Sequence, residues 1–540
     1  MATYQADRGS LSRFYVVANS PERRLRFKKF YSDYSKQLQQ LDFDKMIASD
    51  KVDYILFDRG LNNELRLLDV EEKEYQQIAK YVPFADSIYV IEKMRRRGEV
   101  IEAQRMAKLL ANISQQVAAS AKSLKAEGNM DKALSARAEN TVAGLRAALK
   151  MVYDFFYGYD PAFTWWVPQP YKDLDSALNA YAQLLRSKIS KEVMVKDDGS
   201  GIIGNPIGNE ELIRQLQYEM IPYTPDELVN IANKEFAWCD AEMLKASREM
   251  GFGDDWKKAL EKVKNSYVPE GKQPQMLLGL YNESVDFLKK NDLLNIPPLA
   301  EETWRMMMMS PERQLVAPFF LGGETLLISY PTNTMEQDAK MMSLRGNNPH
   351  FSRAVLHHEL IAGHHLQGFM NNRYKSYRNF STPFSTEGWA LYWEMVLWDK
   401  KFPRSPEDKI GMLFWRMHRC ARIIFSLNYH LGKWTPQQCI DFLVDRVGHE
   451  RANAEGEVRR SFTGGYGPLY QLAYMIGALQ FYDLKKELVD SGKMSFKQFH
   501  EAVLRENNIP VEMVRAILTA QPLKRDFKTS WRFYNAGKGF

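Results

Sequence analysis

The stretch that most constrains this chain is Leu356–Gln367, with the sequence LHHELIAGHHLQ. Four of the nine histidines of the chain fall within it, together with one carboxylate, Glu359. Imidazoles at this density beside a glutamate are typical of a zinc site in which the glutamate acts as a base and not as a ligand. The stretch therefore favours a metal centre. The alternative is a helix whose histidines lie on different faces and only cap or hydrogen-bond.

The spacing of these histidines departs from the usual H-E-x-x-H helix, because the residue four positions after His358 is Ala362. From His358 to His364 a straight helix rises by about 9 Å, whereas zinc needs each ring nitrogen within about 2.1 Å. A straight helix cannot bring this pair to one ion. We therefore predict a bulge or wide turn at Ala362-Gly363, since glycine can adopt backbone conformations closed to other residues.

A second helix is predicted to begin within Ser381–Thr386 and to continue through the run EGWALYWE, Glu387–Glu394. Two histidines and a glutamate from a neighbouring antiparallel helix are the ligand arrangement of the Glu-zincins. We predict Glu387 as the third ligand, and Glu394, two turns later on nearly the same face, as the second choice. The alternative for Glu387 is an exposed acid favoured by the helix dipole, which fits poorly beside an apolar run.

The motifs H-E-x-x-x-G-H-H-L-Q and E-G-W-A-L-Y resemble those of the bacterial domain-of-unknown-function 885 family, regarded as zincin-like metallopeptidases. The resemblance is strongest between residues 310 and 490. Within that range the chain has Ala362 where the family usually has proline, and Leu469-Tyr470 where it tends to have Gly-Gln. These changes leave the metal ligands intact and alter the surroundings of the substrate.

The resemblance implies one zinc ion per chain, with the ligands His358, His364 and Glu387. His365 is an alternative to His364 as the second ligand. Tyr474 matches a tyrosine of the family and is the expected donor to the oxyanion of the reaction, with Tyr466 as the second choice. Arg422 and His430 are candidates for binding a substrate carboxylate.

The main functional hypothesis is zinc-dependent hydrolysis of a peptide bond, that is, a metallopeptidase of the gluzincin type. Glu359 is the expected general base, which takes a proton from the attacking water and passes it to the leaving amine. Two alternatives stay open. One is a zinc-dependent hydrolase of an amide or ester of a small metabolite, and the other is a non-catalytic, degenerate zincin that binds peptide.

The composition is that of a globular protein, with 45% hydrophobic and 26% charged residues. The net charge of +6 arises from 73 basic and 67 acidic residues that are interleaved, so no nucleic-acid partner is expected. No run of about 18 apolar residues is present, so no membrane span is expected. The three cysteines suit neither a disulfide framework nor a zinc ribbon. Periplasmic or secreted localisation is favoured, with the cytoplasm as the alternative.

The predicted fold is mainly α, a large helical zincin-like fold in one compact body with a central cleft. Residues 1–195 are expected to form a helical scaffold, and residues 196–540 the catalytic region. That region contains a small sheet in residues 297–333, the metal helices in 348–400 and further helices to 522. The strands are expected at Leu315–Leu321 and Thr325–Pro331. In the scaffold, four helices are expected at 22–48, 69–97, 101–126 and 131–156.

Overall fold

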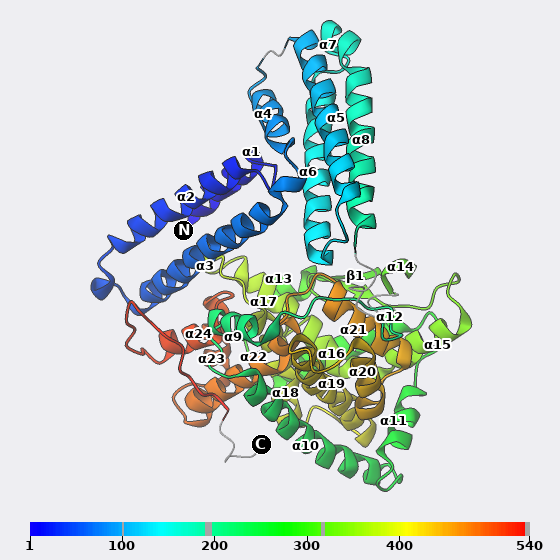
Figure 1. Ribbon diagram of the computed structural model, residues 1–540. Coiled ribbons are helices and arrows are strands. Elements are labelled where there is room, and N and C mark those ends of the chain that lie inside the picture. Colours follow the sequence, from blue (N-terminus) through cyan, green and yellow to red (C-terminus); the bar gives the residue numbers. More distant parts are fainter. Residues whose placement is uncertain (100–101, 190–196, 315–318, 535–540) are drawn as a thin grey trace. The chain divides into compact units, whose positions relative to one another are not determined.

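The computed structural model of this chain describes residues 1–99, 102–189, 197–314 and 319–534. Helices dominate these ranges and a single two-stranded sheet accompanies them, which confirms the mainly-α prediction (Figure 1). Residues 1–42 and 56–196 form one compact unit, and residues 43–55 and 197–540 form a second. Among the described residues, every helix is too short or too polar to cross a bilayer.

The first unit is built from helices that bury apolar stripes against one another. On α6, Lys132–Phe156, which lies where a helix was predicted at 131–156, Ala138, Val142 and Leu145 are fully buried and Leu149 and Val152 nearly so. Three helices of this unit, α5, α6 and α8, run side by side (Figure 1). Two of the predicted helices have wrong bounds. One helix, α3 Ala48–Ile78, spans the predicted break between residues 48 and 69, and the predicted helix 69–97 is interrupted between Ile78 and Ala85. The helices are α1 Ala2–Phe14, α2 Pro21–Gln39, α3 Ala48–Ile78, α4 Ala85–Arg96, α5 Ala103–Ala126, α6 Lys132–Phe156, α7 Pro161–Trp166 and α8 Pro168–Ser187.

The second unit carries all residues of the candidate site. Several of its helices begin at clear capping signals, as at Thr224, where the threonine and Glu227 form a capping box. The helices are α9 Gly208–Tyr218, α10 Pro225–Glu249, α11 Trp256–Lys264, α12 Gln273–Lys290, α13 Pro298–Thr303, α14 Pro311–Gln314, α15 Gln337–Gly346, α16 Pro349–Glu359, α17 His364–Asn371, α18 Pro383–Asp399, α19 Pro406–His430, α20 Pro436–Phe442, α21 Arg451–Thr463, α22 Tyr470–Lys485, α23 Phe496–Arg505 and α24 Val511–Leu518.

The sheet differs in part from the prediction. Strand β2, Thr325–Ile328, lies within a predicted strand, but its partner is β1, Arg305–Met308, which pairs with it in parallel. Of the other predicted strand, residues 315–318 lie outside the described residues, and Leu321 forms only an isolated antiparallel bridge with Leu327. The partner was missed because β1 is largely exposed and lacks the alternation of apolar and polar residues that marks a half-buried strand.

The two helices α18 and α22 cross at a pair of glycines. A Cβ at Gly388 of α18 would lie 2.6 Å from backbone atoms of Gly477 of α22, and a Cβ at Gly477 would overlap the carbonyl of Phe384. Only glycine therefore allows this approach of the two backbones. Because Gly388 follows Glu387 directly, the crossing brings the carboxylate of Glu387 against the first turn of α22.

Candidate metal centre

The helix that carries the histidine cluster is interrupted where the spacing predicted. Helix α16 ends at Glu359, and α17 begins at His364. Between them, regular bonding is replaced by wider hydrogen bonds, from Gly363 N–H to His357 O at 2.8 Å and from Leu366 N–H to Leu360 O at 3.3 Å. The prediction that the chain leaves helical geometry near Ala362-Gly363 is confirmed.

The interruption is held by contacts that few other residues could make. A Cβ at Gly363 would overlap the carbonyl of His358, so glycine is required at this position. From α18, the indole Nε1–H of Trp389 donates a hydrogen bond of 2.8 Å to the carbonyl of Ala362. Trp389 lies two positions after Glu387 and is fully buried. The helix that carries the predicted third ligand therefore also fixes the turn between the two histidines.

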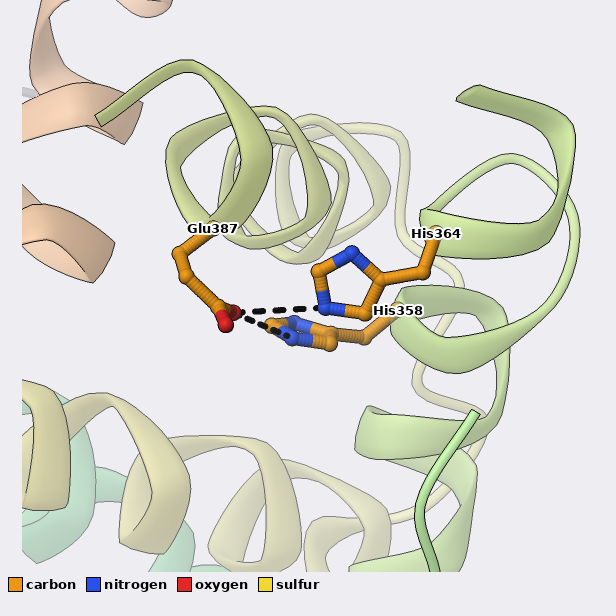
Figure 2. Close-up of side chains that lie close together, drawn as sticks. All are labelled: His358, His364 and Glu387. Carbon is orange, nitrogen blue, oxygen red and sulfur yellow. Dashed lines mark ion pairs between the residues drawn. The ribbon is translucent and has the colours of Figure 1, made fainter. Parts of the chain in front are cut away.

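The turn brings three predicted ligands together (Figure 2). Oε2 of Glu387 lies 3.6 Å from Nε2 of His358 and 3.2 Å from Nε2 of His364. One ligand atom from each residue lies within 4.8 Å of the other two. The two imidazole planes are nearly perpendicular, at 88°, and the Nε2 atom of each ring faces the same carboxylate oxygen. These three atoms are the donors that could hold one ion.

Glu394, the second choice as a ligand, has a different place. Its Oε1 accepts a hydrogen bond of 2.7 Å from Nδ1–H of His358, and it lies 3.7 Å from the guanidinium of Arg419. A carboxylate that binds Nδ1–H fixes the tautomer of the ring and leaves the lone pair of Nε2 free for a metal. Glu394 thus orients a ligand and does not join the cluster.

The charges of the centre suit a cation. Burial by itself would raise the pKa of Glu387, but the imidazoles of His364 and His358 lower it well below its usual value. Burial would likewise lower the pKa of His358, but the nearby carboxylates of Glu387 and Glu394 raise it to about 9. The buried carboxylates therefore hold positive charge at this point, whether it is carried by protons or by a metal ion.

The donor set fits zinc in type and spacing. Two ligands that each lie about 2.1 Å from a tetrahedral ion are about 3.4 Å apart, which lies between the two measured oxygen–nitrogen distances, 3.2 and 3.6 Å. Oε2 of Glu387 is buried and makes no hydrogen bond within the described part of the chain. Buried polar atoms normally have a partner, and an ion between Glu387 and the imidazoles would supply one.

The second oxygen of Glu387 is held by a tyrosine. The hydroxyl of Tyr470, at the start of α22, donates a hydrogen bond to Oε1 of Glu387, and the ring of Tyr470 packs edge-to-face on that of Tyr474, with 5.7 Å between the centroids. The ring of Tyr474 lies parallel to that of His358, with 6.1 Å between their centroids. The resemblance to the family indicated Tyr474. It gave no sign that the hydroxyl of Tyr470 hydrogen-bonds to the candidate ligand Glu387.

The predicted base, Glu359, lies at the end of α16, next to His358. Its backbone carbonyl accepts a hydrogen bond of 3.1 Å from the N–H of Gly323. Its side chain lies so close to Gly322 that a Cβ there would come within 2.5 Å of Oε2. The segment Gly322-Gly323 therefore borders the carboxylate, and Glu359 is partly exposed whereas His358 is buried.

The other histidines of the motif point elsewhere. Nε2 of His365 hydrogen-bonds to the carbonyl of Ala300 in α13, at a distance of 2.7 Å. His357 is buried beside Phe402, and burial lowers its pKa to about 4. Neither contributes to the cluster of His358, His364 and Glu387, so the geometry favours His364 over His365 as the second ligand.

The two residues predicted to bind a substrate carboxylate, Arg422 and His430, both have partners within the protein. Nε–H of Arg422 donates to Glu457 at 2.7 Å, and both side chains are almost completely buried. His430 packs its ring against Tyr429 and Phe462. Arg422 is thus held in an internal ion pair, and the ring of His430 is packed among aromatic side chains.

The fold and the site together define a helical protein with two histidines and a glutamate gathered at an interrupted helix. The chain belongs to the family described as bacterial protein of unknown function (DUF885), whose model matches residues 7–518. No curated protein matches the chain.

Two solved structures share this fold. A putative lipoprotein of unknown function from Shewanella oneidensis has 16% sequence identity and a TM-score of 0.69, and the match covers 96% of this chain and 98% of that one. A putative lipoprotein from Colwellia psychrerythraea also has 16% identity, with a TM-score of 0.58 and coverage of 93% and 91%. At this identity the likeness establishes the fold alone.

Replacing Tyr470 by phenylalanine removes one hydroxyl and retains the ring. Because that hydroxyl holds Oε1 of Glu387, we expect Tyr470→Phe to weaken zinc binding by about 10–100-fold, the usual cost of losing an outer-shell partner. Competition with a chromophoric chelator measures this change. Tyr466→Phe is the matched control, because its ring packs on that of Tyr470 at 4.4 Å. Equal zinc affinity in the two variants would show that the hydrogen bond has no role.

Proposed function

We propose that this protein is a zinc-dependent hydrolase that cleaves peptide bonds. The observation that carries the proposal is the convergence of His358, His364 and Glu387 (Figure 2), with Glu359 next to His358 in the sequence. The first three supply the two nitrogens and one oxygen of a catalytic zinc site, a set that leaves a position open. A bound zinc ion would polarise a carbonyl and make water acidic near neutral pH.

The residues around the ligands have separate roles in this proposal. Glu359 accepts a proton from the attacking water and delivers it to the leaving amine, since it is next to a ligand and does not belong to the ligand set. Glu394 fixes the ring of His358, and Tyr470 fixes the carboxylate of Glu387. The hydroxyl of Tyr474 is the proposed donor to the developing oxyanion, since that of Tyr470 already donates to Glu387.

A hydrolase of small amides or esters is the second candidate. It is favoured by the replacement of the family's Gly-Gln by Leu469-Tyr470, since Tyr470 puts a large side chain directly beside Glu387. A bulky ring at that position reduces the space for an extended peptide. A non-catalytic role is less favoured, because a protein that only binds peptide has no use for a base at Glu359.

Activity with and without chelator separates these candidates. We expect the purified, zinc-loaded chain to cleave members of a mixed peptide library, to lose this activity with a chelator and to regain it with added zinc. The products are read by mass spectrometry. Cleavage of small amides or esters alone would favour the second candidate, and binding of peptides without any cleavage would favour the non-catalytic role.

We propose further that the protein acts outside the cytoplasm. The support is that two structural neighbours are described as putative lipoproteins. Fractionation of cells that express the full natural gene tests this localisation.

A further inference from the structure

Three arginines lie around Tyr474, one side chain away from the candidate metal ligands. The guanidinium carbons of Arg419 and Arg422 lie 4.7 and 4.5 Å from the centroid of the Tyr474 ring. The third, Arg460 of α21, lies over the ring of Tyr466, with 4.8 Å between its guanidinium carbon and the ring centroid. Its charge also lowers the pKa of Tyr474, although burial is the larger effect and raises it to about 12.

The carboxylate of Glu387 acts on Arg422 but is shared with the imidazoles of His358 and His364, which leaves Glu457 and Glu394 to balance the three arginines. Arg422 forms an ion pair with Glu457 at 2.7 Å. Arg419 lies 3.7 Å from Glu394, which is also hydrogen-bonded to His358. Arg460 is left with Glu457 at 3.9 Å, too far for a hydrogen bond. The two histidines of the same cluster, His418 and His449, add no negative charge. The described part of the cluster therefore has an excess of positive charge at Arg460.

Arg460 is also the arginine of the three that a ligand can reach. Its side chain is 16% exposed, against 5% for Arg419 and 4% for Arg422. Its Nε is buried and makes no hydrogen bond to the described residues. Tyr466, over which it lies, is 38% exposed, so the pair forms an accessible rim of the site. A guanidinium with free donors beside a hydrolytic centre is suited to binding a planar anion.

We propose that Arg460 binds the C-terminal carboxylate of a peptide, so that the enzyme removes residues from the C-terminal end of its substrate. The inference rests on the proposed zinc-dependent hydrolase. In the reaction, the hydroxyl of water joins the carbonyl carbon, the C–N bond breaks, and the water proton goes to the leaving amine. The products are a shortened peptide and a C-terminal fragment, and no further reactant is needed. The surplus of positive charge disfavours an N-terminal ammonium at the same place.

Matched peptides with a free or an amidated C-terminus test the assignment. We expect the zinc-loaded chain to cleave the free acid with a kcat/KM about 10–100-fold above that for the amide, the range for one charge-assisted, two-pronged contact. Arg460→Gln should remove this preference, mainly through KM, at unchanged zinc content. Arg460→Lys, which keeps the charge, should restore part of it.

Arg459→Gln is the control for the change of charge. Arg459 is the exposed neighbour of Arg460 and donates a hydrogen bond to the backbone of Gly201. We expect this variant to keep the preference for the free acid. If Arg460→Gln keeps the preference for the free acid, or if Arg459→Gln loses it as well, the assignment is overturned.

A binding measurement without turnover completes the test. Calorimetry on zinc-loaded Glu359→Gln compares acetyl-trialanine with its C-terminal amide, and we expect tighter binding of the acid that disappears when Arg460→Gln is added. Equal cleavage of acid and amide by the unaltered chain, or equal binding, overturns the role of Arg460 and leaves the hydrolase standing. Failure to cleave either peptide with zinc present contradicts the proposed function itself.

Discussion

Glu359→Gln is expected to lower kcat by about 10²–10⁴-fold while zinc stays bound, because the substitution removes the basicity of the carboxylate and little else. Glutamine has nearly the same size as glutamate. The backbone carbonyl of residue 359, which bonds to the N–H of Gly323, is unaffected. KM should change little, since the general base acts in the transition state. Steady-state kinetics on a cleaved peptide, with metal analysis of the same sample, measure both effects.

Glu324→Gln is the control for this experiment. Glu324 lies directly after Gly323, but its side chain is exposed and pairs with Arg305. We expect this variant to retain full activity. Near-normal hydrolysis by Glu359→Gln would end the proposed mechanism, and loss of folding, seen by circular dichroism, would indicate a structural role for Glu359.

His364→Gln is expected to release zinc, whereas His365→Gln should keep it. The two residues are adjacent in the sequence, but the structure separates them. Nε2 of His364 faces Glu387 at 3.2 Å, and Nε2 of His365 faces the carbonyl of Ala300. Removing a ligand should weaken zinc binding by well over the ~10–100-fold that an outer-shell partner contributes. Metal content after dialysis against a weak chelator gives the answer.

The pair of variants is its own control, because both exchange a histidine for the same residue at neighbouring positions. The amide of glutamine at 365 can still donate to the carbonyl of Ala300, so the fold should survive. Retention of zinc in His364→Gln together with its loss in His365→Gln would reassign the second ligand. Retention in both would remove the histidine pair from the metal centre.

Much of the candidate site could be predicted from local spacing. The six-residue step from His358 to His364 is incompatible with a straight helix, and the break between α16 and α17 follows from it. Gly363 marked the position of the break, and the structure shows that a side chain there would collide with the preceding turn. Such features involve residues close in sequence, so the covalent geometry of the backbone limits the possible outcomes.

Other features depended on segments that meet only in the folded chain. The position of Glu387 follows from the close crossing of Gly388 and Gly477, which lie on different helices. Nothing near Tyr470 in the sequence shows that its hydroxyl meets that carboxylate. Arg460 could not be told from the other residues among the 73 basic ones by type alone, and its lack of a close carboxylate emerges only from the packing of α19, α21 and α22.

The sequence by itself determined the chemistry that this protein can offer: two imidazoles and a carboxylate in a pattern that needs a broken helix, with an acid beside the first histidine. Only the tertiary structure brought His364, and not His365, to Glu387, and placed the carboxylate of Glu394 on Nδ1 of His358. The physical reason is that residue type and spacing restrict what a side chain can do, whereas its partner depends on which distant helix packs against it.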